Sequence, residues 1–204
     1  MKNKNNINFF LRYYLKSLNN ALDKISKREL EKASELIEKT IKKDKHIYVC
    51  GNGGSGAIAD HYVVDYTKQL SKNTSLKAKI RSLNSDSYLM TAIANDISYD
   101  EIFSFQASRY IKSGDILILI SSSGNSKNIK NVLKYCNKNN IKTIGFSNFS
   151  GGYLKTNCTI SIHSKIDNYG IGEDINHILM HVIMQYLSLK NLNKSKNKNK
   201  KIIL

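Results

Sequence analysis

The sequence predicts an α/β fold in which helices cover both faces of a parallel sheet. From about residue 46 onward, short apolar runs alternate with helical segments, and this alternation is typical of consecutive βαβ units. Two turns rich in glycine and serine, at 51–56 and 121–126, each follow an apolar run and precede a helix. In a parallel sheet such turns meet at the carboxyl ends of the strands, where ligands bind near the switch point of the strand order.

Two helices are expected ahead of the sheet. The first covers about residues 8–18 and carries aromatic side chains available for burial, and the second covers 27–43, with apolar residues at helical spacing. Five strands are expected at 46–50, 77–83, 115–120, 141–147 and 157–163, and further helices at 54–70, 86–95, 99–111, 125–139 and 172–189.

The chain of 204 residues is expected to form one domain. That domain covers residues 1–189 and includes the N-terminal helices within 1–45. Residues 190–204 are rich in lysine and asparagine, and they are expected to form a disordered basic tail.

The first turn, Cys50-Gly51-Asn52-Gly53-Gly54-Ser55-Gly56, places bare backbone N–H groups at a helix N-terminus, which attracts phosphate. Its glycines also match the G-x-G-x-x-G dinucleotide fingerprint. That fingerprint expects an acidic residue at the end of the next strand to hold a ribose, and the next expected strand ends in Asn84. The turn therefore predicts phosphate binding without a nucleotide cofactor.

The second turn, Ser121-Ser122-Ser123-Gly124-Asn125-Ser126, collects four hydroxyl groups and a glycine at the start of a helix. Helix capping alone explains one such residue. The cluster therefore favours a second set of phosphate donors.

The charge and composition argue against a nucleic-acid-binding, membrane-spanning or secreted protein. The net charge is +16, but residues 1–45 and 190–204 each carry six more basic than acidic residues. Aromatic residues are not interleaved with the tail lysines, so nucleic-acid binding is not expected. No apolar run is long enough to span a membrane, no signal peptide is expected, and the three cysteines fit no metal motif. A cytoplasmic protein is expected.

Five segments together resemble the sugar isomerase (SIS) domain family, in particular proteins of the phosphoheptose isomerase type. They are 50–55, 89–96, Gly114-Asp115, 120–126 and Gly151-Gly152, and the resemblance extends over about 37–187. It implies a flavodoxin-like three-layer α/β/α sandwich with a five-stranded parallel sheet. It also implies a homotetramer whose active sites lie between subunits and are built partly by the N-terminal helices.

The activity that the resemblance implies is the aldose–ketose isomerisation of sedoheptulose 7-phosphate to D-glycero-D-manno-heptose 7-phosphate. This reaction opens heptose synthesis for surface polysaccharides such as lipopolysaccharide or capsule. The implied substrate-binding residues are Asn52, Gly53, Gly54, Ser55, Asn95, Asp96, Ser121, Ser122, Ser123, Ser126 and Glu173.

Isomerisation through an enediol needs a base over two neighbouring carbons and an acid at their oxygens. His61 and Asp65 are four residues apart on one expected helix, and His181 follows Glu173 by eight residues on another. In the resembled family the corresponding helices carry a histidine with a glutamate base four later, and a Gln-Glu pair followed by a histidine. Asp65 is thus expected to be the base and His181 the acid, with Asp65 standing for the family's glutamate and Glu173 for its glutamine.

The same positions can hold a metal ion. His61, Asp65, Glu173 and His181 offer two imidazoles and two carboxylates, a donor set acceptable to zinc, and some members of the family hold zinc there. The alternative for His61 is an ordinary helix contact with Asp65, and His177 is interpreted as a core histidine.

Two other functions remain open at this stage. One is a non-catalytic SIS protein that binds a phosphosugar as a regulator, such as the DnaA initiator-associating protein. The other is an isomerase of a different sugar phosphate, which the replacements at Asp65 and Glu173 permit.

Overall fold

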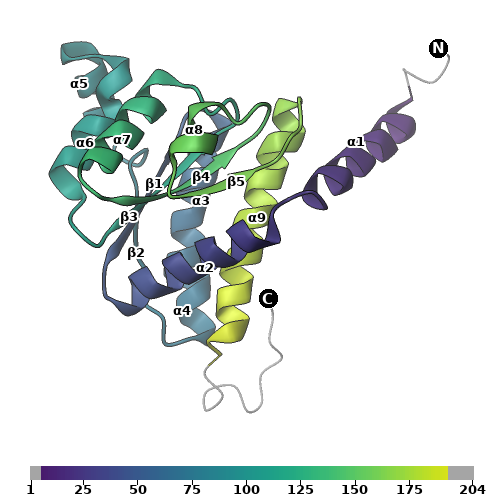
Figure 1. Ribbon diagram of the computed structural model, residues 1–204, viewed down its shortest axis with the longest axis horizontal. Coiled ribbons are helices and arrows are strands. Elements are labelled where there is room, and N and C mark those ends of the chain that lie inside the picture. Colours follow the sequence, from purple (N-terminus) through teal and green to yellow (C-terminus); the bar gives the residue numbers. More distant parts are fainter. Residues whose placement is uncertain (1–5, 193–204) are drawn as a thin grey trace.

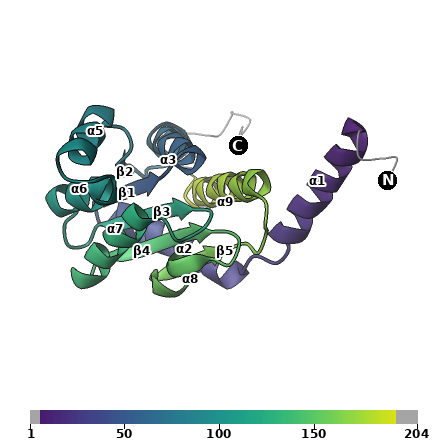
Figure 2. The same cartoon turned by 90° about the horizontal axis from the view of Figure 1, so that it is seen from above.

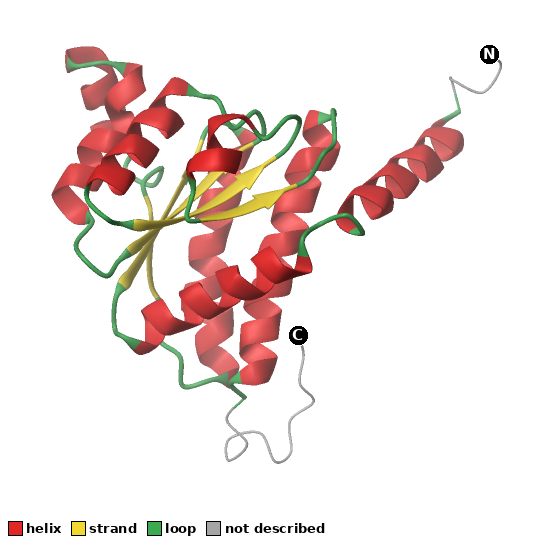
Figure 3. Cartoon of the chain, viewed as in Figure 1, coloured by secondary structure: helices red, strands yellow, loops and turns green. Residues whose placement is uncertain are grey.

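The five expected strands pair in parallel in the order β2-β1-β3-β4-β5. A computed structural model describes residues 6–192 of the chain and confirms the predicted α/β fold (Figures 1 and 3). The strands are β1 (His46–Gly51), β2 (Lys79–Ser82), β3 (Ile116–Ser121), β4 (Lys142–Ser147) and β5 (Ile160–His163).

Helices form a layer on each side of this sheet (Figure 2). One layer contains α2 (Lys27–Lys42), α3 (Gly54–Val64), α4 (Leu70–Asn73) and α9 (Tyr169–Lys190). The other contains α5 (Ser87–Asp96), α6 (Ile102–Tyr110), α7 (Lys127–Lys138) and α8 (Gly152–Asn157). The result is the three-layer sandwich that the family resemblance implied.

The alternation of side chains along the strands divides the interior into two cores. On β3, Ile116, Ile118 and Ile120 pack with α2, α3 and α9, whereas Leu117 and Leu119 pack with α6 and α7. All five are buried, because a parallel sheet covered on both faces leaves neither set of side chains in water.

The strand order places the switch point between β1 and β3. The chain leaves β1 toward α3 on one face and leaves β3 toward α7 on the other. Both polar turns therefore open at the same crevice, which is the usual ligand position in a doubly wound sheet.

The helix expected at 54–70 is not uniform. It begins as α3, passes into a π-helical segment, η1 (Asp65–Gln69), and ends as α4. The backbone N–H of Leu70 donates to the carbonyl oxygen of Asp65, five residues earlier. Such π segments are often found at functional sites, and this one begins at Asp65.

The remaining elements differ modestly from the expected boundaries. A short 3₁₀ turn, η2 (Tyr99–Glu101), precedes α6, the helix α8 was not expected, and α9 begins three residues earlier than expected. Lys190, the first residue of the expected tail, is the last residue of α9, and residues 193–204 lie outside the described part of the chain. Among the described helices, none is both long and apolar enough to cross a membrane.

The first helix, α1 (Ile7–Leu22), extends away from the sandwich (Figures 1 and 2). Its C-terminal half touches the core through Leu18, Ala21 and Leu22. Six apolar side chains on it are about half exposed or more: Ile7, Phe9, Phe10, Leu11, Tyr13 and Leu15.

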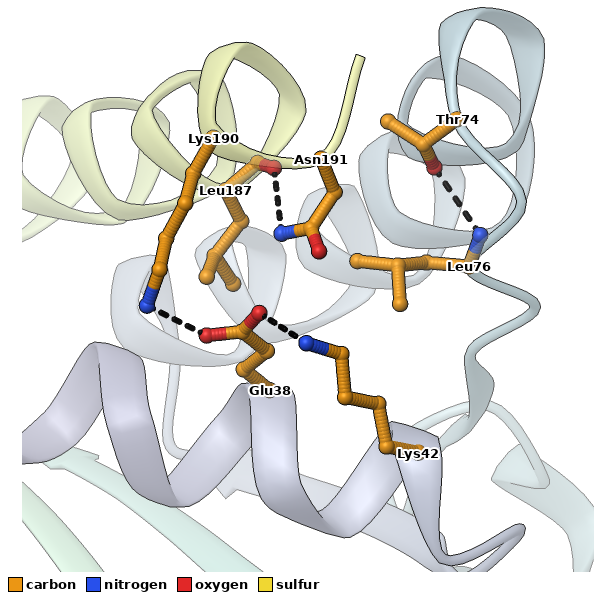
Figure 4. A network of polar contacts seen from close by, with 7 residues as sticks. All are labelled: Glu38, Lys42, Thr74, Leu76, Leu187, Lys190 and Asn191. Atoms are coloured by element: carbon orange, nitrogen blue, oxygen red, sulfur yellow. Dashed lines mark hydrogen bonds and ion pairs between the residues drawn. The ribbon is translucent and has the colours of Figure 1, made fainter. Parts of the chain in front are cut away.

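A carboxylate between two lysines joins α2 to the end of α9 (Figure 4). Glu38 lies 2.5 Å from the Nζ of Lys42 and 2.7 Å from that of Lys190. Burial alone would raise the pKa of Glu38, but the hydrogen bonds from Lys190 and Lys42 outweigh it and lower the pKa from 4.5 to about 2. The ionised carboxylate is thus strongly favoured in the folded protein.

We expect Glu38→Gln to lower the free energy of unfolding by about 1–2 kcal/mol at pH 7, because both lysines lose a charged partner. The folded-state pKa lies below the unfolded one, so this stability is fully present above about pH 4.5 and is lost as the pH falls toward 2. Urea titrations of both proteins between pH 3 and 7 measure the difference.

The matched control is Glu35→Gln, an exposed glutamate on the same helix. It should change stability by less than about 0.5 kcal/mol. A Glu38→Gln protein that is as stable as this control at pH 7 would contradict the prediction.

Candidate active site

A polar cavity of about 140 Å³ lies at the switch point. Its lining consists of Asn52 and Ser55 from the first turn, Ser121, Ser122, Ser123 and Ser126 from the second, and Tyr169 and Glu173 from α9. The structure thus brings together the two turns that the sequence singled out. Tyr169 was not predicted, because nothing in the spacing marks the start of α9 as part of the cavity.

The residues that precede the two helices at this cavity do not cap them with their side chains. Gly53 precedes α3 and Ser126 precedes α7, and neither makes a side-chain capping hydrogen bond. By contrast, α1, α2, α5 and α9 are all capped by side chains. The hydroxyl of Ser126 is therefore not used as a cap, and both helix ends can direct N–H groups at an anion.

Asn128 holds the two turns in register. Its side-chain amide donates to Asn52 Oδ1 and accepts from Asn52 Nδ2, both at 2.9 Å. Asn128 is buried, and Tyr99 donates a further hydrogen bond to Asn52 Oδ1 at 3.1 Å. Sequence reasoning missed Asn128, because a single asparagine in the first turn of a helix carries no pattern.

Asn84 stands where the dinucleotide fingerprint expects an acidic residue that holds a ribose, and the structure shows what this asparagine does instead. Its amide accepts from the N–H of Gly51 at 3.1 Å and donates to the carbonyl oxygen of Gly51 at 2.7 Å. The side chain thus continues the pairing of β1 with β2 for one more residue. An acid there would lack the donor for the Gly51 carbonyl, so the position fixes the first turn.

The Gly151-Gly152 segment supports the second turn. A Cβ at Gly124 would lie 2.0 Å from the carbonyl oxygen of Gly151, and one at Gly152 would lie 2.4 Å from that of Ser123. Both Gly151 and Gly152 have positive φ. These glycines are required by close backbone approach rather than by ligand contact.

Helices α3 and α9 run side by side in the same direction and, with η1, carry the candidate acid, base and metal ligands. Gly54 lies against Glu173, since a Cβ at Gly54 would be 2.6 Å from the carboxylate oxygens. One to two turns further along, the ring of His61 contacts the rings of His177 and His181. Ile58, Tyr62, Ile175 and Leu179 pack behind this line in the core.

Asp65, His61 and His181 converge at one point. His181 Nε2 lies 3.0 Å from Asp65 Oδ2 and 3.2 Å from His61 Nε2, and His61 Nε2 lies 3.6 Å from Asp65 Oδ2. The Asp65 side chain is 14% exposed, whereas those of His61 and His181 are 46% and 38% exposed. A carboxylate and two imidazoles thus face an accessible space.

His177 lies beside this cluster rather than in the core. Its ring centroid is 4.7 Å from that of His61 and 4.6 Å from that of His181. Burial, followed by the nearby rings of His181 and His61, lowers the pKa of His177 and favours its neutral form. The interpretation of His177 as a core histidine was therefore incomplete, because the sequence could not place it against α3.

The expected metal set is only partly assembled. Asp65 lies within 3.6 Å of His61 and 3.0 Å of His181, whereas Glu173 lines the cavity. Among the described residues, the group of three possible ligands whose atoms all lie within 4.8 Å of one another is His61, His177 and His181. The donor chemistry at His61, Asp65 and His181 fits zinc, which binds imidazole and carboxylate ligands.

Four expected substrate residues are not part of the cavity lining: Gly53 and Gly54, which lie in the first turn beside it, and Asn95 and Asp96. Asn95 and Asp96 end α5, are exposed, and hydrogen-bond to each other at 2.9 Å. Neither lines the cavity. Their expected role in sugar binding stays a prediction.

Tyr14 links the protruding helix to the site. Its hydroxyl donates to Asp174 Oδ2 at 2.7 Å, next to Glu173. Burial and this hydrogen bond raise the pKa of Tyr14 to about 12, so the hydroxyl stays protonated as a donor.

Comparison with known proteins identifies relatives of this chain. The model of the SIS domain family matches residues 13–148. The chain is 35% identical to the phosphoheptose isomerase of Aliarcobacter butzleri over 158 aligned residues. The alignment covers 78% of this chain and 83% of that protein. The chain is 34% identical over 157 residues to a probable phosphoheptose isomerase of Thermoplasma acidophilum, covering 77% and 86%.

Solved structures share the fold. The phosphoheptose isomerase GmhA from Neisseria gonorrhoeae superposes with a TM-score of 0.82 at 24% identity, covering 90% of this chain and 97% of that one. A phosphoheptose isomerase from Francisella tularensis superposes with a TM-score of 0.82 at 22% identity, and the superposition covers 93% of this chain and 100% of that one.

Proposed function

The chain belongs to the SIS domain family, and we propose that it is a phosphoheptose isomerase, which interconverts sedoheptulose 7-phosphate and D-glycero-D-manno-heptose 7-phosphate. The similarity to phosphoheptose isomerases supports this function. One structural observation carries the mechanism: a phosphate-sized polar cavity and an acid–base cluster lie along the same pair of helices.

The phosphate is bound by neutral donors. The cavity lining contains five serine hydroxyls and two uncapped helix N-termini, and it contains no lysine or arginine. Helix N-termini bind phosphate through oriented N–H groups and the positive end of the helix dipole. Glu173, the one carboxylate in the lining, is placed to accept hydrogen bonds from sugar hydroxyls rather than from phosphate.

The spacing suits a long sugar. Glu173 at the cavity and His181 at the cluster are eight residues apart on α9, which is about 12 Å along the axis, and side chains lean back toward the helix N-terminus. The six C–C bonds of a heptose span roughly 8 Å before the phosphate ester is added. A substrate held by its 7-phosphate therefore places its first two carbons near Asp65 and His181.

The proton transfers follow from these positions. Asp65 takes the proton from C1 of the ketose while His181 donates a proton to the carbonyl oxygen at C2, which gives the enediol. The oxygen at C1 then loses its proton to the histidine, and Asp65 returns a proton to C2, which gives the aldose. A protein that only bound the phosphosugar would need the serine cavity alone, so the convergence of Asp65 with two histidines favours catalysis.

A zinc ion is part of the proposal. His61, Asp65 and His181 would hold it. When bound, it would supply Lewis-acid stabilisation of the developing oxyanion, in place of the proton that His181 donates without the metal.

The enzyme assignment is tested with the purified protein and sedoheptulose 7-phosphate in D₂O. We expect aldose formation with deuterium incorporated at the reacting carbons. We expect Asp65→Asn to lower kcat by about 10²- to 10⁴-fold, because the variant lacks the base. Product formation and deuterium incorporation are followed by NMR.

The matched control is Asp60→Asn, which changes an exposed aspartate on the same helix, α3. It should have wild-type kcat. An Asp65→Asn protein as active as this control would exclude Asp65 as the base.

We further propose that the active enzyme is a homotetramer. The exposed apolar side chains on α1 form a surface suited to association between copies, and Tyr14 connects that helix to Asp174 beside the cavity. Deleting residues 1–20 should lower both the mass measured by light scattering and the activity. A full-length protein that is an active monomer would overturn this proposal.

A further inference from the structure

His177 on α9 is the third histidine of the cluster with His61 and His181, and it has no part in the proton transfers described above. Its Nε2 is buried and has no hydrogen-bond partner among the described residues. A buried imidazole nitrogen without a partner loses the hydrogen bond it had with water. The Nε2 atom of His177 would therefore be stabilised by a bound ligand.

The neighbouring ligand atoms have the spacing of a metal site. The nitrogen and oxygen atoms of His61, Asp65 and His181 form a triangle with sides of 3.0, 3.2 and 3.6 Å. Zinc binds nitrogen and oxygen at about 2.0–2.2 Å in a tetrahedron, whose edges are then about 3.3–3.6 Å. One side of the triangle has this length and the other two are about 0.1–0.3 Å shorter than its lower limit, so small movements of the side chains would form one face of such a tetrahedron.

His177 lies near two corners of this triangle, His61 and His181, and Glu173 does not belong to that group. The ligand atoms of His61, His177 and His181 all lie within 4.8 Å of one another. Glu173 lies two turns nearer the start of α9 than His181 does, and its carboxylate packs on Gly54 and lines the serine cavity.

We propose that a zinc ion is held by His61, Asp65, His177 and His181, with His177 in the place that the family resemblance gave to Glu173. Three neutral imidazoles and one carboxylate form a donor set that suits zinc. Glu173 is then left free to contact the sugar. The inference rests on the proposed function for the use of the metal, but metal binding itself is measured without a sugar.

The test counts ligands directly. Full-length protein is stripped with a chelator, reloaded with one equivalent of zinc and studied by X-ray absorption at the zinc edge. We expect three imidazole ligands in the wild-type protein and in Glu173→Gln, and two in His177→Gln.

Zinc affinity, measured by competition with a chromophoric chelator, provides the second readout. His177→Gln should weaken binding by about 10²-fold or more, since even the loss of an outer-shell partner costs 10- to 100-fold. Glu173→Gln should change it less than about threefold. The matched control is His163→Gln, which changes a half-buried histidine outside the cluster, and it should bind zinc as the wild type does. Thermal melts of the stripped proteins show whether each variant folds.

Two imidazole ligands in the wild-type protein would overturn the inference, whatever the variants do. So would weakened binding in Glu173→Gln together with unchanged binding in His177→Gln, or a wild-type protein that does not bind zinc at micromolar concentrations. A protein that binds zinc through three imidazoles but does not isomerise sedoheptulose 7-phosphate would leave this inference standing and refute the proposed function.

Discussion

The parallel packing of α3 against α9 determines the geometry of the whole site. Both helices begin at the carboxyl edge of the sheet, so the contact of Gly54 with Glu173 sets the register for every later pair. His61 then meets His177 and His181, and Thr74 meets Leu192 beyond the ends of both helices. A side chain at Gly54 would displace the Glu173 carboxylate from this contact, so the placing of Glu173 at the cavity depends on the glycine.

The far end of this helix pair is stabilised separately. Glu38 on α2 binds Lys190 in the last turn of α9, and the amide of Asn191 caps the carbonyl oxygen of Leu187 (Figure 4). A cation in the last turn also complements the helix dipole. The acid–base cluster therefore lies between two fixed ends, the first turn of α9 at the cavity and this ion pair.

Much of the fold could be predicted from the sequence, because the strands are short apolar runs separated by helices and the two polar turns follow strands directly. A strand that is buried on both faces can also be predicted from its continuous apolar sequence, as in β3. The π segment at Asp65 could not be predicted, since one extra residue per turn leaves no mark on hydrophobic periodicity. The site was predictable as far as its two turns and the side chains of Asp65 and His181, whose spacing on each helix was visible; their roles as base and acid stay proposals. Asn84, Asn128 and His177 were not, because each acts through a partner from another element.

We propose that the distance between the serine cavity and the cluster of Asp65, His61 and His181 selects the length of the sugar. The most direct measurement is kcat/KM for ketose phosphates with a terminal phosphate and five, six or seven carbons. The account predicts that kcat/KM rises with chain length and is highest for sedoheptulose 7-phosphate, because only the longest chain reaches Asp65 with its phosphate in the serine cavity. Equal or higher kcat/KM for the five-carbon substrate would contradict it.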